Sequence, residues 1–279
     1  MICEATFVNE TTPLEPDDAI PAEVRRQRIV GLLLEQDHVR VADLATRFGT
    51  SEVTIRTDLA ALAARGQLTR VRGGAMARPT TQPHRELPFA ESLLEHADEK
   101  AAIGYAAAQR VQSADSVILD VGTTTTAVAR ALVARHELRD VTVFTNGLNI
   151  ALELEAAAPW LTVVVLGGTL RSMQHSLVDP LAGLILDRIT ANVAFIGAHG
   201  IDAAAGLTNA NIAEAEMKRR MMLAARRRVA VLDGSKLGVV SLARVCDAGD
   251  IDLLITGASA DPSVVNAIRE AGPEIRVVP

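Results

Sequence analysis

The chain has 279 residues, of which 49% are hydrophobic and 3% aromatic, with a formal net charge of −6. This length favours two domains with an aliphatic core, and so few aromatic residues argue against recognition of RNA by base stacking. The two cysteines and six histidines show no disulfide or metal-ligand spacing, so we expect no metal and no cofactor. Because the sequence has neither an apolar run of membrane-spanning length nor a signal peptide, we expect a soluble, cytoplasmic protein.

Charge is distributed unevenly along the sequence. Residues 23–78 contain ten arginines and six acidic residues, so the rest of the chain carries the negative excess. A positive segment in an acidic protein is typical of a DNA-binding domain attached to a domain that does not bind DNA.

The N-terminal part of the chain divides into a leader and a first domain. Residues 1–20 combine prolines and acids without hydrophobic periodicity, so we expect a disordered leader. Residues 21–78 are expected to form the first domain, which opens with a helix from about Pro21 whose apolar face includes Val24 and Ile29. Arg25 near its start opposes the helix dipole. DNA phosphate would offset this conflict, and a solvated charged face is the alternative.

The next residues predict a helix-turn-helix followed by a wing. A helix over Val41–Phe48 leads through a Gly-Thr turn to Ser51, which can cap a second helix that buries Val53, Ile55, Leu59 and Leu62. Gly66 ends that helix, and the alternating run 68–72 before a Gly-Gly pair predicts a hairpin. In a winged helix-turn-helix such a helix enters the major groove, and the wing lies along the backbone or minor groove.

Polar residues at the front of the second helix and on the wing are the candidate DNA contacts. Arg56 can donate to guanine or grip phosphate, and the wing arginines can hold phosphate or the minor groove. Asp58 is expected to pair with an arginine rather than to read a base. The candidate DNA-binding residues are Arg25, Arg40, Ser51, Glu52, Thr54, Arg56, Thr57, Arg70 and Arg72.

The rest of the chain predicts a linker and an α/β domain. Residues 79–97 contain three prolines among polar residues and are expected to be the linker. Residues 98–279 are expected to form a doubly wound, mostly parallel sheet with its ligand site at the carboxyl ends of the strands. The predicted strands are the apolar runs 116–122, 141–146, 161–168, 192–198, 228–234, 251–257 and 275–278.

One turn of this domain has the composition of an anion site. In Asp120–Thr126 (DVGTTTT) a strand meets a helix, so free amides, the helix dipole and hydroxyls converge, although a threonine-rich helix start without a ligand would look similar. The chain has only three lysines, Lys100, Lys218 and Lys236, and all lie in this domain. Glu214 and Lys218 have the spacing of a simple helix ion pair.

Motifs in both domains resemble the DeoR (GlpR-type) family of bacterial transcriptional regulators. They are TIR-x-DL…L-x-RVRGGA in the first domain and GTTTT, TNG, LGG, GAHGID, GLT…E-x-E-x-K and DGSK in the second. The resemblance implies a second domain similar to ribose-5-phosphate isomerase. Thr57 and Arg40 depart from the family pattern, so we expect an operator unlike those of relatives. It implies that phosphate is bound by Gly122, Thr123, Thr124, Thr125 and Lys100, and that Asn146, Gly168, Glu214, Lys218 and Lys236 surround a sugar.

The same resemblance indicates whether the second domain senses a ligand or catalyses a reaction. The isomerases carry two acids where this chain has the run 196–199, IGAH, so we expect binding without turnover. His199 either contacts the ligand or has a local hydrogen-bonding role, and Arg171 contacts the ligand or forms a salt bridge. We expect a homo-oligomeric repressor of sugar metabolism genes, dimer or tetramer, that a phosphorylated sugar or derivative releases from operator DNA. An activator and an isomerase-like enzyme are the alternatives.

Overall fold

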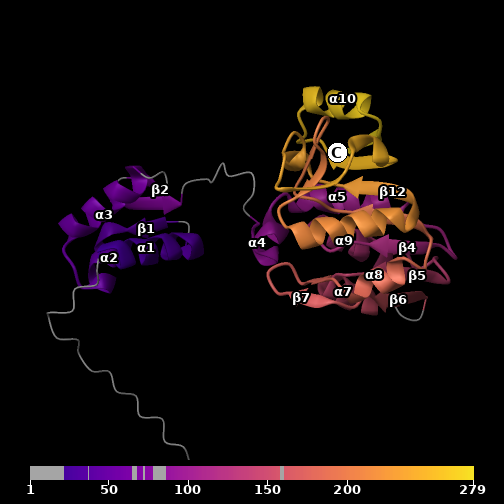
Figure 1. The fold of residues 1–279 in the computed structure, drawn as a ribbon, viewed down its shortest axis with the longest axis horizontal. Helices are drawn as coiled ribbons and strands as arrows, with labels where there is room; N and C mark the ends of the chain where they lie inside the picture. Colours follow the sequence, from indigo (N-terminus) through magenta and orange to yellow (C-terminus); the bar gives the residue numbers. More distant parts are fainter. Residues whose placement is uncertain (1–21, 37, 65–67, 72, 78–85, 158–159) are drawn as a thin grey trace, which may run out of the picture. The chain divides into compact units, whose positions relative to one another are not determined.

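The computed structural model describes residues 22–279 apart from 37, 65–67, 72, 78–85 and 158–159. The chain divides into two compact units between Thr81 and Gln82, and each is described by itself (Figure 1). The expected leader, Gly66 and Arg72 lie outside the described residues. Within the described residues, no helix is both long and apolar enough to span a bilayer.

The first unit contains three helices and a small antiparallel sheet of strand order β1-β3-β2. The strand β1 was not expected from the sequence. It pairs with β3, where Gly74 lies so close to Val39 that a Cβ would approach the Val39 carbonyl oxygen to 2.1 Å. The elements are α1 (Ala22–Gln36), β1 (His38–Arg40), α2 (Val41–Phe48), α3 (Glu52–Ala64), β2 (Leu68–Val71) and β3 (Gly74–Ala77).

The helix α3 begins as the sequence predicts, but its buried face is narrower. The Ser51 Oγ accepts a hydrogen bond from the Thr54 amide at 3.1 Å, and Ile55, Leu59 and Leu62 are buried. The expectation that Val53 packs inward is wrong, because its side chain is 69% exposed. Two residues along a helix correspond to a rotation of roughly 200°, so Val53 faces away when Ile55 faces the core. Val24 of α1 is also largely exposed, at 40%.

The second unit is built on one seven-stranded sheet in which every neighbouring pair is parallel. Each of the seven predicted apolar runs forms one of its strands. The strand order is β15-β14-β12-β9-β4-β5-β6. The strands are β4 (Ser116–Leu119), β5 (Val141–Thr145), β6 (Leu161–Val165), β9 (Ala191–Ile196), β12 (Ala225–Val231), β14 (Leu253–Gly257) and β15 (Glu274–Val278).

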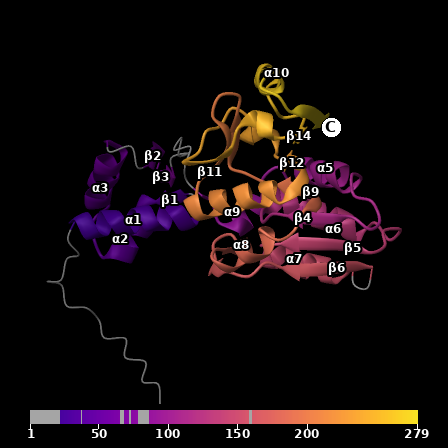
Figure 2. The same ribbon diagram turned by 45° about the vertical axis from the view of Figure 1, so that its right-hand side comes forward.

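Helices cover both faces of this sheet, as predicted (Figure 2). One face packs against α5 (Ala97–Ala108), α6 (Thr123–Val133) and α7 (Leu148–Glu155). The other packs against α8 (Leu181–Leu186), α9 (Ile212–Leu223) and α10 (Pro262–Glu270). The strands that follow β4 in the chain are added on one side of it, ending with β6. The strands that follow β9 are added on the opposite side, ending with β15. The junction of β4 and β9 is therefore the switch point at which open α/β sheets form ligand crevices.

Several shorter elements were not expected. The helix α4 (Phe89–Leu94) lies in the expected linker, and buried Phe89 shows that residues 86–97 belong to the second unit. The linker expected over 79–97 is therefore wrong for its C-terminal part. The remaining elements are β7 (Thr169–Arg171), β8 (Ser176–Val178), β10 (Gly200–Asp202), β11 (Gly206–Asn209), β13 (Ala243–Cys246) and the 3-10 turns Gly234–Lys236 and Ala248–Asp250.

Candidate functional site

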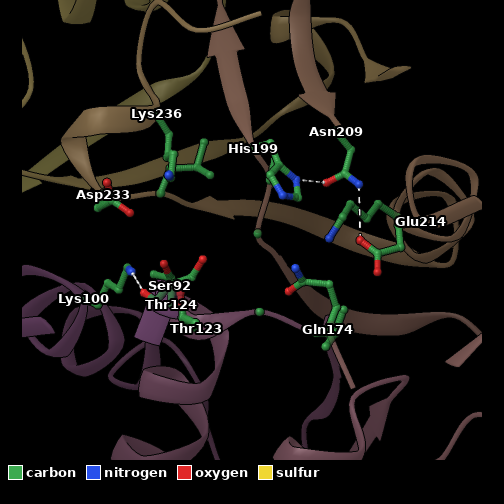
Figure 3. A pocket seen from close by; sticks show the side chains of 16 residues that line it. Ser92, Lys100, Thr123, Thr124, Gln174, His199, Asn209, Glu214, Asp233 and Lys236 are labelled. Atoms are coloured by element: carbon green, nitrogen blue, oxygen red, sulfur yellow. Dashed lines mark hydrogen bonds between the residues drawn. The ribbon is translucent and has the colours of Figure 1, made fainter. Parts of the chain in front are cut away.

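A pocket opens where β4 and β9 end (Figure 3). It encloses about 620 Å³ of empty space, a figure that includes the open solvent at its mouth. Its lining comes from the loops after β4, β7, β9 and β12, from the end of β11 and from the helices α4, α5, α6 and α9. The lining residues are Ser92, Lys100, Val121, Gly122, Thr123, Thr124, Gln174, Gly197, Ala198, His199, Asn209, Glu214, Lys218, Leu232, Asp233 and Lys236.

The start of α6 forms one wall of this pocket. Gly122 precedes the helix with a positive φ of 145°, and the hydroxyls of Thr125 and Thr126 both donate to its carbonyl oxygen, at 3.0 and 2.7 Å. These bonds hold the turn in shape. The first N–H groups of a helix lack intrahelical partners, so an anion beside Thr123 and Thr124 would meet free amides and the positive end of the dipole.

All three lysines of the chain line this one pocket. Lys100 and Lys218 are 4% and 3% exposed, and Lys236 is half-buried. The Lys100 Nζ donates to the Ser92 carbonyl oxygen at 2.6 Å. Burial lowers the pKa of Lys100, Asp233 raises it and Lys236 lowers it further. The buried Lys100 ammonium donates to a neutral carbonyl group, and a buried ammonium group is unfavourable without an anionic partner, so its position favours a negatively charged ligand.

Lys218 forms an ion pair with Asp120 rather than with Glu214, the partner that helix spacing suggested. The Asp120 carboxylate is buried at the end of β4, and its Oδ2 also accepts from the Gly197 amide at 3.2 Å. Its Oδ1 has no hydrogen-bond partner among the described residues. Burial raises the pKa of Asp120 to about 6, and Lys218 opposes this rise only in part.

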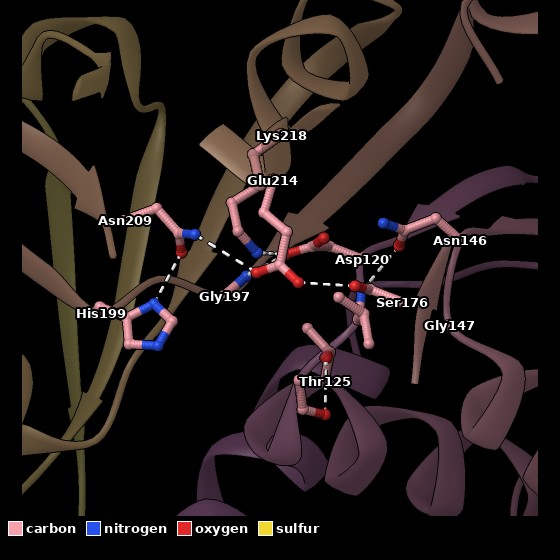
Figure 4. Close-up of polar contacts among 12 residues, drawn as sticks. Asp120, Thr125, Asn146, Gly147, Ser176, Gly197, His199, Asn209, Glu214 and Lys218 are labelled. Atoms are coloured by element: carbon pink, nitrogen blue, oxygen red, sulfur yellow. Dashed lines mark hydrogen bonds and ion pairs between the residues drawn. The ribbon is translucent and has the colours of Figure 1, made fainter. Parts of the chain in front are cut away.

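Glu214 is held as a buried carboxylate at the start of α9 (Figure 4). It accepts hydrogen bonds from the Ser176 Oγ at 2.6 Å and the Asn209 Nδ2 at 3.3 Å, and it forms an ion pair with Arg171. Burial acts to raise the pKa of Glu214, but Lys218, Ser176 and Arg171 together bring it below its ordinary value. Glu214 is therefore an ionised acceptor in the wall of the pocket.

Residues 86–96, which we call the strap, precede α5 and are fastened beside the pocket. The Glu86 carboxylate pairs with Arg171 at 2.7 Å, and Arg171 also pairs with Glu214. The Gln174 Nε2 donates to the Leu87 carbonyl oxygen at 2.6 Å, and the Phe89 amide donates to that of Met173 at 3.0 Å. Together with the Lys100 contact to Ser92, these bonds tie the strap to residues that line the pocket.

The pocket contains seven of the ten predicted effector residues: Lys100, Gly122, Thr123, Thr124, Glu214, Lys218 and Lys236. The other three hold neighbouring backbone in place. Thr125 braces Gly122, and Asn146 accepts from the Val121 amide at 2.9 Å while donating to the Leu177 carbonyl oxygen. Gly168 lies where a Cβ would approach the Val178 carbonyl oxygen to 2.2 Å.

Sequence reasoning missed several polar residues that line or support the pocket. Ser92 and Gln174 come from segments without a motif. Asn209 ends the unexpected strand β11, whereas Asp120 stood within the DVGTTTT motif and was assigned no role. Arg171 forms salt bridges, one of the two roles expected for it.

A cluster of His96, Glu99 and Asp233 lies beside the pocket, with possible ligand atoms within 4.8 Å of one another. Its carboxylates already have protein partners. Glu99 accepts from Ser259 and from the Gly234 amide, and Asp233 accepts from the Ser235 amide. The hydrogen bonds of this cluster therefore connect α5 to the loops after β12 and β14.

The candidate DNA surface of the first unit centres on one face of α3. Glu52, Val53, Arg56, Thr57 and Ala60 are all exposed. Arg56 pairs with Glu52 at 2.5 Å, and the Thr57 hydroxyl donates to the Val53 carbonyl oxygen at 3.0 Å. The other predicted contacts Ser51, Arg40 and Arg70 are exposed as well, whereas Thr54 is half-buried.

The expectation that Arg25 contacts DNA is wrong. Its side chain is buried, and its Nε donates to the Asp58 Oδ2 at 2.6 Å. The Arg26 Nε donates to the other oxygen of Asp58 at 2.9 Å. The predicted pairing of Asp58 with arginine is confirmed, and it uses the Arg25 charge to join α1 to α3 inside the unit.

A helix-turn-helix unit followed in the chain by an α/β domain with a pocket is the architecture of a transcriptional regulator. Residues 25–81 match the DeoR-like helix-turn-helix domain, and residues 95–258 match the DeoR C terminal sensor domain. The chain belongs to the DeoR family.

Two curated relatives span nearly the same length. The putative aga operon transcriptional repressor of Escherichia coli O157:H7 is 34% identical over 91% of this chain and 93% of its own. The HTH-type transcriptional regulator GlpR of Haloferax volcanii is 35% identical over 91% of this chain and 96% of its own. Among solved structures, ribose 5-phosphate isomerase A of Methanocaldococcus jannaschii aligns with a TM-score of 0.39 and 18% identity, over 51% of this chain and 55% of that chain.

Proposed function

We propose that this protein represses genes of sugar metabolism and leaves its operator when a phosphorylated sugar or derivative fills the pocket. The observation that carries the proposal is the convergence of all three lysines on the pocket that also receives the start of α6. Phosphate matches this set, because helix N-terminal amides and ammonium groups both bind anions. The name of the aga operon repressor supports repression as the mode of action.

The strap offers a route from the pocket toward operator affinity. A phosphate oxygen that binds Lys100 competes with the Ser92 carbonyl, its present acceptor. A ligand that contacts Glu214 also changes the surroundings of Arg171, which holds Glu86. Weaker fastening of residues 86–96 alters the segment that follows the DNA-binding unit in sequence. A coupling of about 1.4 kcal/mol, within the usual allosteric range, changes operator affinity tenfold.

The pocket binds its ligand without turnover in this proposal. A general base works best with a pKa near the operating pH, whereas the hydrogen bonds and positive charges around Glu214 bring its pKa below the ordinary value. The pKa of Asp120 is raised to about 6, but this carboxylate is buried behind the pocket wall and paired with Lys218. The isomerase-like alternative predicts aldose–ketose conversion of pentose or hexose phosphates. Conversion at the rate of a true isomerase would overturn the sensor assignment.

The DNA-binding form in this proposal is a homo-oligomer. A single small winged helix buries too little surface for tight specific binding, and paired units match the two-fold symmetry common in operators. Light scattering of the purified protein, alone and with operator DNA, tests this; a monomer in both samples would contradict it.

Thermal-shift screening of phosphorylated sugars against their dephosphorylated forms tests the ligand assignment. We expect stabilisation by at least one phosphorylated compound and loss of that stabilisation in Lys236→Ala. Arg269→Ala is the matched control, because Arg269 is an exposed cation on α10. Two outcomes would contradict the phosphate site. In one, both forms of a sugar stabilise the protein equally; in the other, no phosphorylated compound stabilises it.

A further inference from the structure

His199 reaches the pocket from the loop after β9 and is half-buried there. Its Nδ1 lies 2.8 Å from the Asn209 Oδ1. Its other ring nitrogen, Nε2, points into the space between the labelled side chains, and within the described part of the chain it has no hydrogen-bond partner (Figure 3). One nitrogen is therefore committed to the protein, and the other is available to a ligand.

The neighbours of Asn209 decide which atom of the His199–Asn209 pair carries the proton (Figure 4). The Asn209 Nδ2 lies 3.3 Å from the Glu214 Oε2 and 3.3 Å from the Asn211 carbonyl oxygen, two groups that only accept. A flipped amide would place its oxygen against both acceptors. The Asn209 oxygen therefore faces His199, so the Nδ1 must donate, and a neutral ring then has its lone pair on Nε2.

The surroundings favour the neutral ring. Burial lowers the pKa of His199, the Asn209 hydrogen bond raises it and the positive charge of Lys218 lowers it again, with a net fall below the ordinary value. The other lining groups include three ammonium groups, two threonine hydroxyls and a glutamine amide, which can all donate, and the carboxylates of Glu214 and Asp233, which only accept. Unlike those two carboxylates, the Nε2 of a neutral His199 ring is an acceptor that carries no charge.

We propose that His199 is a specificity-determining residue of the pocket, where its Nε2 accepts a hydrogen bond from a hydroxyl group of the effector. The proposal rests on the proposed function, in which the pocket holds a phosphorylated sugar or derivative. Asn209 and Glu214 are the positioning residues that hold the ring in this form. A carboxylate or carbonyl oxygen in place of the hydroxyl would set one lone pair against another.

The tautomer can be measured without knowing the effector. In the full-length protein with ¹⁵N-labelled histidine rings, long-range ¹H–¹⁵N correlations at about pH 7 distinguish the two neutral tautomers and the cation. Signals that disappear in His199→Gln belong to this residue. We expect a proton on Nδ1 and none on Nε2, and a loss of this preference in Asn209→Leu. A proton on Nε2 in the wild-type protein would overturn the proposal.

Ligand selection is measured by calorimetry with two matched pairs of probes. Glucitol phosphate and phosphogluconate differ only by a terminal hydroxymethyl or carboxylate group, as do glycerol phosphate and phosphoglycerate. We expect the ratio of polyol to acid affinity to fall roughly tenfold in His199→Phe for at least one pair, while His199→Gln, whose side-chain oxygen accepts, restores part of it. Attraction of the acids by the lysines is common to all three proteins and cancels in this comparison.

An unchanged affinity ratio in His199→Phe would overturn the proposal, as would failure of all four probes while inorganic phosphate binds. If inorganic phosphate and all four probes fail to bind, the proposed phosphate site is contradicted instead. The tautomer of His199 would still decide whether its Nε2 can accept.

Discussion

Val53 is an exposed aliphatic side chain on the same face of α3 as Arg56 and Thr57. In a helix that enters the major groove, such a side chain is suited to contact the methyl group of thymine. We expect Val53→Ala to weaken operator binding by about 1 kcal/mol, roughly fivefold, through loss of apolar contact. Its effect on the free energy of unfolding should stay within about 0.5 kcal/mol, as for most exposed positions.

Leu59→Ala is the matched control for Val53→Ala on the same helix. Leu59 is 1% exposed, so its truncation should lower the free energy of unfolding by roughly 2–5 kcal/mol. Anisotropy titrations with operator DNA and urea unfolding give the two readouts. Unchanged operator affinity in Val53→Ala would exclude this contact.

Asp120 gives the clearest pH dependence of any single residue. Its pKa is raised from 3.8 to about 6, so the folded protein binds this proton more tightly than the unfolded chain does. The contribution of Asp120 to stability is therefore fully present below about pH 4 and is lost as the pH rises through about 6, by roughly 3 kcal/mol at most. Most carboxylates of folded proteins act in the opposite direction.

Asp120→Asn removes this titration. We expect the wild-type protein to lose stability relative to Asp120→Asn as the pH is raised from about 4 to about 7. Urea unfolding of both proteins at several pH values measures the difference. A difference that grows in favour of the wild type over this range would mean that Lys218 lowers the pKa of Asp120 more than burial raises it.

The strap, residues 86–96, is held by contacts with residues that lie far along the chain. Glu86 pairs with Arg171 but does not itself line the pocket. We expect Glu86→Gln to reduce the effect of a bound phosphorylated effector on operator affinity by roughly threefold to tenfold, because one fastening of the strap is weakened. Operator titrations with and without that effector measure this coupling.

Glu91→Gln is the control for the strap, because Glu91 is an exposed acid on α4. It removes the same charge from the same segment, so its coupling should match that of the wild type. Equal losses of coupling in both variants would point to charge alone, and an unchanged coupling in Glu86→Gln would exclude the Arg171 contact from the route.

The sequence predicts the seven sheet strands because each is a continuous apolar run long enough to stand out. The short pairs β7–β8 and β10–β11 carry no such signal, since neither lies in a continuous apolar run. The helix α4 is hidden among prolines. Burial of Phe89 against residues far along the chain makes it part of the second unit, and local sequence does not encode that contact.

The candidate site was predictable where residues follow strand ends, as with Gly122, Thr123 and Lys236. Partner choice was not predictable. Glu214 and Lys218 are neighbours on one helix but do not pair with each other. Lys218 pairs with Asp120, 98 residues away, and Glu214 pairs with Arg171. Topology decides such contacts, because the switch point brings the loops after β4 and β9 together.

At the scale of the whole molecule, one unit presents arginines and an exposed helix face, and the other gathers every lysine of the chain into one pocket. The net charge of −6 is compatible with a positive DNA-binding segment, because the acidic excess lies in the rest of the chain. The proposed function depends on coupling between the two units, so it is tested best with the full chain and both ligands present.

Operator release measures that coupling directly. The protein is bound to a labelled operator fragment, which it has itself selected from genomic DNA, and fluorescence anisotropy is recorded during titration with phosphorylated sugars and their dephosphorylated forms. We predict that at least one phosphorylated compound weakens operator binding tenfold or more, about 1.4 kcal/mol, and that Lys236→Ala abolishes the response while Arg269→Ala retains it. Release by a sugar irrespective of its phosphate, or a full response in Lys236→Ala, would contradict the account.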